Sequence, residues 1–267
     1  MDPRDALVAV LGRVPLRVVD PLAWGIAWVW WWVLPIRRRD AVEALRASLP
    51  DLAPRPVLTR MMHDIALGYI ELLQFDRLTI TVEGAENLPP GALVLAGHGG
   101  SWDVALLAWA DTFPLAIFLR TPSDPWTRRF LAEHRARHDL VALETGATMD
   151  DAYAALESGR AVFFIQDQRH AKGISSPFFG RPARTSAGIA AAFAKTGRPV
   201  WAAWQHRVGV GRHHLCIEPL EIPAPVFPQR RDRTTDIQAL TDATNAWYEA
   251  RIREYPHGWL WLHRRWR

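Results

Sequence analysis

Cysteine is almost absent from this sequence: Cys216 is the only one among 267 residues. A single thiol excludes an internal disulfide and is compatible with a reducing compartment. No Gly-x-Ser-x-Gly segment occurs, which argues against a serine hydrolase with a nucleophile elbow. The ten histidines are scattered along the chain without the spacing of metal ligands, so no metal is expected.

The sequence has no apolar run long enough to span a bilayer as a helix. Its most apolar stretch, residues 22–34, holds thirteen residues, five of them tryptophan. As a helix it rises about 20 Å, short of the roughly 30 Å of bilayer hydrocarbon. The tryptophans and the adjacent Arg37–Arg39 triplet favour a helix lying in one leaflet against anionic head groups. The alternative is a helix buried in the core.

An excess of charge is also missing, since Lys plus Arg exceed Asp plus Glu by only 32 to 28. The arginines nevertheless cluster. Such clusters suit partners that carry phosphate or acidic groups: a membrane surface, a phosphorylated sugar lipid or an acidic carrier protein. Nucleic acid is not expected, because no recognised binding motif accompanies the clusters. They occur at 37–39, 128–129, 135 and 137, 230–231, and 264–265.

Short apolar runs alternate with helical segments from residue 78 onward. This alternation predicts an α/β fold with a mostly parallel, twisted sheet flanked by helices. Residues 1–75 are expected to be helical and to contact the membrane, and residues 76–267 to form the α/β domain, the two together making one compact unit. Strands are predicted at 78–82, 93–96, 115–119, 140–143, 161–165, 199–204 and 213–217, and helices at 41–49, 56–74, 149–158, 184–195 and 234–254, whereas 175–180 is predicted to be a loop.

The most informative stretch is residues 93–103, Leu-Val-Leu-Ala-Gly-His-Gly-Gly-Ser-Trp-Asp. It predicts a buried strand, a glycine-rich turn, and a helix with Ser101 as its N-cap and Asp103 in its first turn. His98 and Asp103 then lie at the carboxyl end of a strand, where α/β sheets usually bind ligands. Asp167 follows a second buried strand; it is a candidate to assist His98 or bind the acceptor, or is simply a turn carboxylate.

The His-x4-Asp spacing has little value alone, because about one such acidic pair is expected by chance. The sequence contains three: His98 with Asp103, His134 with Asp139, and His213 with Glu218. Five residues of helix rotate a side chain by about 500°, and odd separations in a strand face opposite sides. Only the glycine-rich turn after His98 lets the two side chains meet, so that Asp103 orients the imidazole of a general base.

This stretch resembles the His-x4-Asp motif of glycerolipid acyltransferases, in particular the lipid A late acyltransferases and the related mycobacterial phosphatidylinositol-mannoside acyltransferases. The resemblance extends along nearly the whole chain. A strand ending in Asp167-Gln168 precedes Pro-Phe-Phe-Gly, and the chain ends in Tyr-Pro and then Trp-Leu-His-Arg-Arg-Trp. This aromatic and basic ending suits stacking and contacts with head-group phosphates. Arg120 and Arg135 match two basic positions of the family, with a solvated helix face as the alternative for Arg135.

The resemblance implies transfer of a fatty acyl group from an acyl-carrier-protein or coenzyme A thioester to a hydroxyl of a lipid. It also implies a peripheral or monotopic place on the cytoplasmic face of the inner membrane, and no further cofactor. Backbone amides at residues 99–101 are expected to cradle the oxyanion. The candidate catalytic residues are His98, Asp103 and Asp167, and the candidate substrate-binding residues are Gly99, Gly100, Ser101, Trp102, Arg120, Arg135, Gln168 and Arg169.

Two other classes of function remain open. His-Gly-Gly at residues 98–100 is also typical of the oxyanion loop of lipases, which would make the protein a serine esterase. Alternatively, the chain is a non-catalytic lipid-binding protein that kept the fold. The missing nucleophile elbow disfavours the esterase, and the intact His98 and Asp103 pair disfavours the binding protein.

Overall fold

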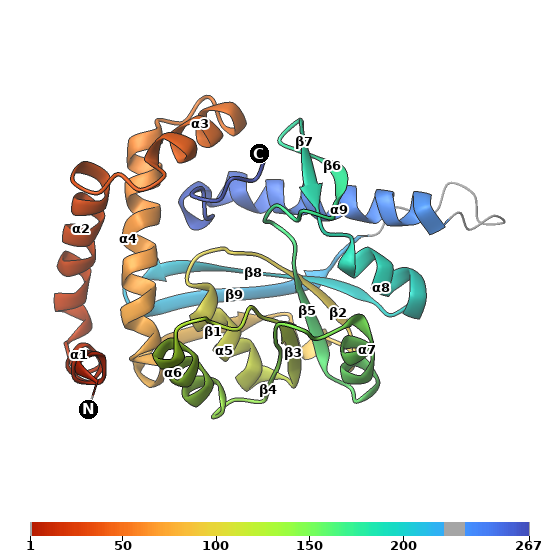
Figure 1. Ribbon diagram of the computed structural model, residues 1–267, viewed down its shortest axis with the longest axis horizontal. Coiled ribbons are helices and arrows are strands. Elements are labelled where there is room, and N and C mark those ends of the chain that lie inside the picture. Colours follow the sequence, from red (N-terminus) through yellow and green to blue (C-terminus); the bar gives the residue numbers. More distant parts are fainter. Residues whose placement is uncertain (1, 222–232, 267) are drawn as a thin grey trace.

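A computed structural model describes residues 2–221 and 233–266 (Figure 1). The chain begins with four helices: α1 (Pro3–Leu11), α2 (Leu16–Trp32), α3 (Arg38–Ser48) and α4 (Pro54–Leu72). Helix α2 packs along α4 at one end of the molecule (Figure 1). Within residues 2–221 and 233–266, no helix is both long and apolar enough to cross a membrane. The arginine pair at 230–231 lies outside the described residues.

Seven strands form the main sheet, in the order β1-β9-β8-β2-β5-β3-β4. Strands β2, β3, β4, β5 and β8 run parallel to one another, and β9 pairs antiparallel with β8 and parallel with β1. The predicted mostly parallel sheet flanked by helices is confirmed. The strands are β1 (Thr79–Glu83), β2 (Leu93–Ala96), β3 (Leu115–Phe118), β4 (Leu140–Leu143), β5 (Ala161–Ile165), β8 (Val200–Gly209) and β9 (Arg212–Pro219).

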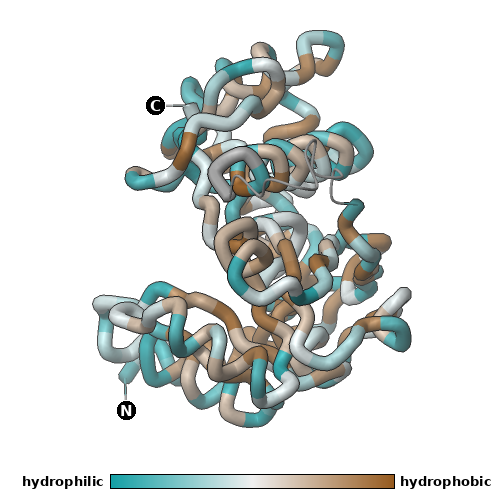
Figure 2. Tube along the Cα trace, turned by 90° about the vertical axis from the view of Figure 1, so that its right-hand side faces the viewer, coloured by the Kyte–Doolittle hydropathy of each residue, from teal (hydrophilic) through white to brown (hydrophobic). Residues whose placement is uncertain are grey.

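Both faces of the sheet are covered, which explains why its central strands are continuous apolar runs. Leu93 and Leu95 of β2 join the core under one layer of helices, whereas Val94 joins the core on the other face. The first layer is made of α7 (Met149–Glu157), α8 (Gly188–Thr196) and α9 (Arg233–Glu254), and the second contains α5 (Trp102–Thr112). Figure 2 shows hydrophobic segments running through the middle of the molecule, between these layers.

The helix α6 (Pro125–Arg135) follows β3, and three short 3-10 turns complete the described chain: η1 (Phe75–Arg77), η2 (Ala85–Asn87) and η3 (Pro256–Gly258). Helix α6 has no buried residue, so it lies on the surface of the α/β fold. Most predicted helices and strands agree with these bounds to within a few residues.

The largest error of the sequence prediction lies at residues 174–185. The expected loop at 175–180 and the start of the expected helix at 184 form an antiparallel hairpin, β6 (Ile174–Phe178) and β7 (Arg181–Thr185). Every second residue is buried, so that Ser176, Phe178, Ala183 and Thr185 face inward. Strand β6 packs on α9. Serine and proline have low strand propensity, so this sequence does not show the alternation of buried and exposed residues that tertiary packing imposes on the hairpin.

Candidate active site

The sheet register brings His98 to Asp167. Strands β2 and β5 are parallel neighbours in which Ala96 pairs with Ile165. His98 and Asp167 each lie two residues beyond that pair, so both leave the carboxyl edge of the sheet side by side. Tyr248 of α9 fixes these two strand ends, because its hydroxyl donates to the Ala96 carbonyl and accepts from the Gln166 amide.

Two hydrogen bonds join His98 to Asp167. The ring Nδ1 lies 2.8 Å from one carboxylate oxygen, and the backbone N–H of His98 donates to the other at 2.7 Å. A carboxylate partner requires the proton on Nδ1, which leaves Nε2 free to accept one. Asp167 is fully buried, whereas the His98 side chain keeps 22% of its surface exposed. The arrangement is that of an oriented general base.

The two groups shift each other's acidity. Burial lowers the pKa of His98, but the charge and the hydrogen bond of Asp167 outweigh it, so the pKa lies above 6.5. Burial raises the pKa of Asp167, yet the positive charge and hydrogen bonds of His98, together with a hydrogen bond from Trp259, hold it below its usual value. Asp167 therefore stays ionised near neutral pH, and it favours the protonated form of His98.

The orienting carboxylate differs from the expected one, because Asp167 and not Asp103 hydrogen-bonds to the His98 ring. Asp103 lies in the first turn of α5 and lines the same cavity as His98. Burial raises its pKa against the charges of Arg135 and His98. The glycine-rich turn places Asp103 on the cavity wall, where it acts on the His98 ring through its charge and not through a hydrogen bond.

The glycine-rich loop is held by contacts that leave fewer free amides than the sequence suggests. Gly100 has a φ of +53°, a left-handed conformation that glycine adopts without strain. Its N–H donates to the Gly258 carbonyl at 2.6 Å, so the expected role of this amide in binding an oxyanion is wrong. The Gly99 carbonyl accepts a hydrogen bond from the buried Gln205 side chain.

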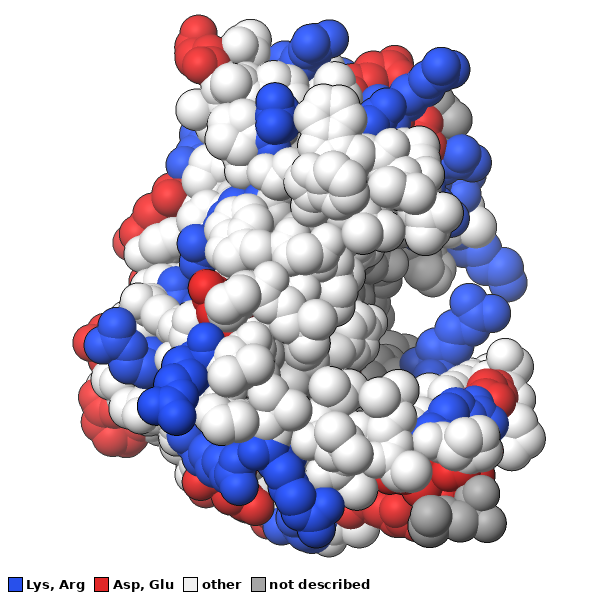
Figure 3. All heavy atoms as spheres, turned by 90° about the vertical axis from the view of Figure 1, so that its left-hand side faces the viewer, with Lys and Arg blue, Asp and Glu red and all other residues white. Residues whose placement is uncertain are grey.

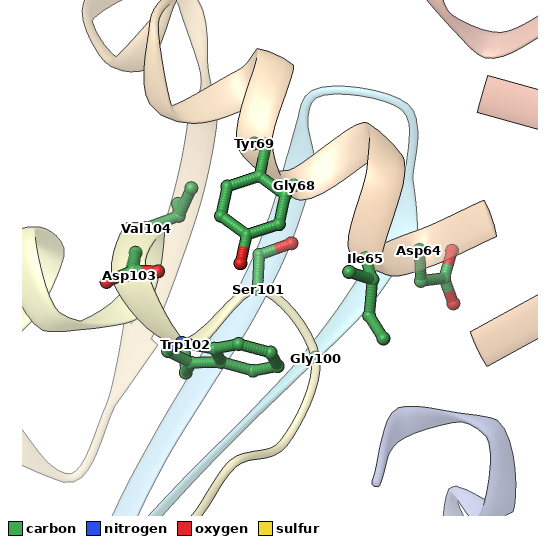
Figure 4. Close-up of a pocket in the computed structure, with 9 residues that line it drawn as sticks. All are labelled: Asp64, Ile65, Gly68, Tyr69, Gly100, Ser101, Trp102, Asp103 and Val104. Carbon is green, nitrogen blue, oxygen red and sulfur yellow. The ribbon is translucent and has the colours of Figure 1, made fainter. Parts of the chain in front are cut away.

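Ser101 occupies the N-cap position of α5, but its hydroxyl makes no capping bond. It accepts a hydrogen bond from Arg207 of β8 at 2.6 Å instead. Figure 4 shows the Ser101 side chain pointing toward α4 at Gly68. A Cβ on Gly68 would lie 2.7 Å from the Ser101 oxygen, so only glycine lets the helix approach this closely.

Arg207 was missed by sequence reasoning, and it lies in a buried ion network behind the loop. Its guanidinium contacts Glu71 and lies 3.3 Å from Asp64, both of α4. Glu71 also accepts from His213 of β9, 3.0 Å away, and from the Gly211 amide at 2.8 Å. All four ionisable side chains are almost fully buried. Glu71 is thus a core carboxylate whose charge is satisfied by Arg207, His213 and the Gly211 backbone N–H.

An apolar cavity of about 140 Å³ opens beside His98, between the sheet and α5. His98, Trp102 and Asp103 line its polar end, and the rings of Trp102 and His98 meet edge to face at 5.5 Å. The remaining wall is almost entirely hydrocarbon or aromatic. It comprises Ala96, Gly97, Ala105, Leu106, Trp109, Ile117, Leu119, Phe163, Ile165, Ala203, Trp204 and Gln205.

The remaining predicted substrate-binding residues are scattered around this cavity. Arg120 is exposed just beyond β3, and Arg135, half-buried at the end of α6, interacts electrostatically with Asp103. Gln168 is half-buried and its carbonyl accepts from Arg265, while Arg169 is exposed. Of these four residues, only Arg135 is electrostatically coupled to a carboxylate of the cavity.

The structure thus places an oriented histidine at the carboxyl edge of the sheet, with an apolar cavity next to it. A family model described as bacterial lipid A biosynthesis acyltransferase matches residues 6–267. The chain therefore belongs to this family and is a lipid acyltransferase.

Curated proteins gave no match. Among solved structures, the 1-acyl-sn-glycerophosphate acyltransferase PlsC from Thermotoga maritima is similar, with 17% sequence identity and a TM-score of 0.37. The match covers 88% of this chain and 98% of that one.

Proposed function

We propose that the protein transfers a fatty acyl group from an acyl-carrier-protein or coenzyme A thioester to a hydroxyl of a membrane lipid. The acceptor is a lipid A-like saccharolipid or another glycolipid or phospholipid. The observation that carries this proposal is the position of His98, whose ring lines the apolar cavity while its Nδ1 is bound to buried Asp167. The free Nε2 is then available to the acceptor hydroxyl next to an apolar chain.

In the proposed reaction, Nε2 of His98 takes the proton of the acceptor hydroxyl as that oxygen attacks the thioester carbonyl. The carbon–sulfur bond then breaks, and the imidazolium returns the proton to the leaving thiolate. Asp167 stabilises the imidazolium between these steps. Because the Gly100 amide is already bonded to Gly258, the amides of Ser101 and Trp102 at the N-terminus of α5 are the better candidates to bind the oxyanion.

No acyl-enzyme is expected on Ser101. Its hydroxyl is buried and accepts a hydrogen bond from the Arg207 guanidinium, a group that stays protonated and cannot act as its base. The acyl chain instead enters the cavity between the sheet and α5, where Trp109 and Phe163 supply aromatic walls. Apolar burial of about 25 cal/mol per Å² then favours a long hydrocarbon chain over water in this space.

The proposed place of the protein is the cytoplasmic face of the inner membrane, held peripherally or as a monotopic protein. Helix α2 supports this, because one of its faces is apolar and uncovered. Figure 3 looks onto this side of the molecule, where a broad uncharged area is bordered by Lys and Arg side chains, with Asp and Glu also along its edges. The exposed apolar residues of α2 and the turn after it are Val18, Leu22, Trp24, Ile26, Trp28, Val29, Trp32, Val33, Leu34 and Ile36.

Replacing Trp28 and Trp32 by serine is expected to weaken binding to anionic vesicles about tenfold for each change. These indoles are 59% and 51% exposed, and insertion into the interface removes part of that apolar area from water. Sedimentation with phosphatidylglycerol vesicles measures the binding. Val141→Ser is the control, since Val141 is exposed on β4. Equal binding by all variants would show that α2 does not touch the bilayer.

Asp103→Asn is expected to lower the rate on the order of a hundredfold without unfolding the protein. Asp103 adds negative charge to the cavity in which the imidazolium forms, and that charge favours the protonated base. The acid limb of the kcat/KM profile should therefore move to lower pH in this variant. A full rate and an unmoved acid limb would exclude Asp103 from the reaction.

The proposed function is tested by direct transfer. Purified protein is incubated with a radiolabelled C12–C18 acyl group on coenzyme A or on acyl carrier protein, in the presence of bacterial membrane lipid. Label appearing in a lipid in a protein-dependent way is the expected result. Labelling of the protein by a serine-directed phosphonate would favour the esterase, and lipid binding without transfer from either donor would favour the non-catalytic alternative.

A further inference from the structure

The C-terminal segment, residues 255–266, packs inside the molecule. Trp259, Trp261 and Arg265 are each at most 1% exposed. The expected contact of these side chains with lipid head groups is therefore wrong. The segment contacts α4 and α9 through η3 and reaches the catalytic loop, where Gly99 pairs with Trp259 in an isolated antiparallel bridge.

Trp259 contacts the catalytic pair directly. Its indole N–H donates to Asp167 at 3.0 Å, on the same carboxylate oxygen that accepts the His98 backbone N–H at 2.7 Å. The other oxygen holds the His98 ring. Every donor that the structure gives to Asp167 thus comes from either His98 or Trp259. A fully buried carboxylate depends on such donors for both its charge and its orientation.

Arg265 anchors the same segment. Its guanidinium donates to the carbonyls of Gln168 at 3.2 Å and Arg184 at 2.7 Å, and to Thr185 at 2.6 Å. Within the described part of the chain, no carboxylate lies within ion-pair distance of it. Burial lowers the pKa of Arg265 to about 10, and the charge of Asp167 opposes that shift. The anchor thus holds the residue that directly follows Asp167.

We propose that Trp259 is a positioning residue for acyl transfer: its indole N–H holds the Asp167 carboxylate in the plane and charge state that orient His98. This inference rests on the proposed function. Removal of the indole N–H takes one of three hydrogen bonds from Asp167. The carboxylate oxygen that accepted it then keeps the His98 backbone N–H as its single donor. The carboxylate then keeps more negative charge for the His98 ring and is held less firmly.

The test removes the N–H with little change of shape. Trp259 is replaced by phenylalanine and, in a second variant, by 3-benzothienylalanine, in which sulfur takes the place of the indole N–H. The matched control is Trp261→Phe, because Trp261 is equally buried in the same segment and its indole N–H donates to the Pro256 carbonyl instead of to Asp167. Release of thiol from palmitoyl-coenzyme A or palmitoyl-acyl carrier protein, whichever the wild type uses, gives kcat and KM.

Both Trp259 variants are expected to lose about tenfold in kcat, which is the scale of one hydrogen bond to a charged acceptor, with KM changed less than twofold. The acid limb of the kcat/KM profile should move to higher pH, since His98 holds its proton more tightly beside a less satisfied carboxylate. The Trp261 control should keep the wild-type limb. A benzothienylalanine variant with wild-type kcat and acid limb overturns the proposal.

The proposed function and this inference fail in different ways. If His98→Ala retains its rate, the base mechanism is wrong, and the Trp259 results have no bearing on it. If His98→Ala is inactive and both Trp259 variants match the wild type or the Trp261 control, the mechanism stands and the positioning role is wrong. Circular dichroism and thermal unfolding of every variant identify any loss that comes from unfolding.

Discussion

Replacing His98 by alanine is expected to lower acyl transfer by a factor of about a thousand or more while the protein stays folded. General-base catalysis alone supplies roughly a hundredfold to ten-thousandfold, and within the described cavity lining no other histidine is present to replace it. Folding should survive, because the ring lies at the cavity surface and Asp167 keeps the donors from the His98 backbone and from Trp259. Transfer of radiolabelled acyl groups measures the loss.

His98→Gln sharpens this test. A glutamine amide donates to Asp167 much as Nδ1–H does but has no basic nitrogen, so a loss equal to that of His98→Ala assigns the effect to proton transfer. Asp167→Asn should cost on the order of a hundredfold or more, because an amide in this position favours the wrong ring tautomer, as in other oriented-histidine sites. Retention of most of the rate by His98→Gln would contradict the base role.

The His98–Asp167 contact was only partly predictable from the sequence. Each residue lies two positions after a buried apolar run, at 93–96 and 161–165, and these positions placed both at the carboxyl edge of a sheet. Their contact, however, depends on β2 and β5 being neighbours with Ala96 opposite Ile165. Two strands and three helices intervene along the chain, so local patterns carry no information on that pairing. Asp103 is only five positions from His98 in the sequence, and this short spacing favoured Asp103 as the partner of the ring.

The C-terminal segment was misjudged for a different physical reason. Alternating tryptophan and arginine is typical of a membrane interface. The local sequence does not distinguish such a segment from one that is buried in the core. Burial of Arg265 is possible because the Arg184 carbonyl, Thr185 and Asn245 accept hydrogen bonds from its guanidinium and Phe178 faces the guanidinium at 5.0 Å. These acceptors come from the β6–β7 hairpin and α9, so an error in the hairpin concealed the partner of the segment as well.

Glu71→Gln is expected to destabilise the fold by about 3 kcal/mol, the lower end of the cost of breaking a buried ion pair. Glu71 balances buried Arg207 and His213, and a neutral amide leaves the guanidinium with Asp64 as its remaining carboxylate contact. For a chain of this length, such a loss corresponds to roughly 10 °C in Tm. Calorimetry measures it, and Asp76→Asn, which removes an exposed partner 4.0 Å from Arg137, should change stability by less than about 0.5 kcal/mol.

The pH dependence of this loss identifies its origin. Burial raises the pKa of Glu71, but His213 and Arg207 outweigh it and hold the pKa below 4.5. A carboxylate with a lowered folded-state pKa stabilises the protein above its unfolded pKa, and this contribution is lost as pH falls through the folded value. The difference in stability between wild type and Glu71→Gln should therefore be full at neutral pH and shrink below about pH 4.5. A difference that stays constant on acidification would assign the loss to packing instead of charge.

Because Arg207 also holds Ser101, the Glu71→Gln variant should lose activity together with stability, through movement of the loop that carries His98.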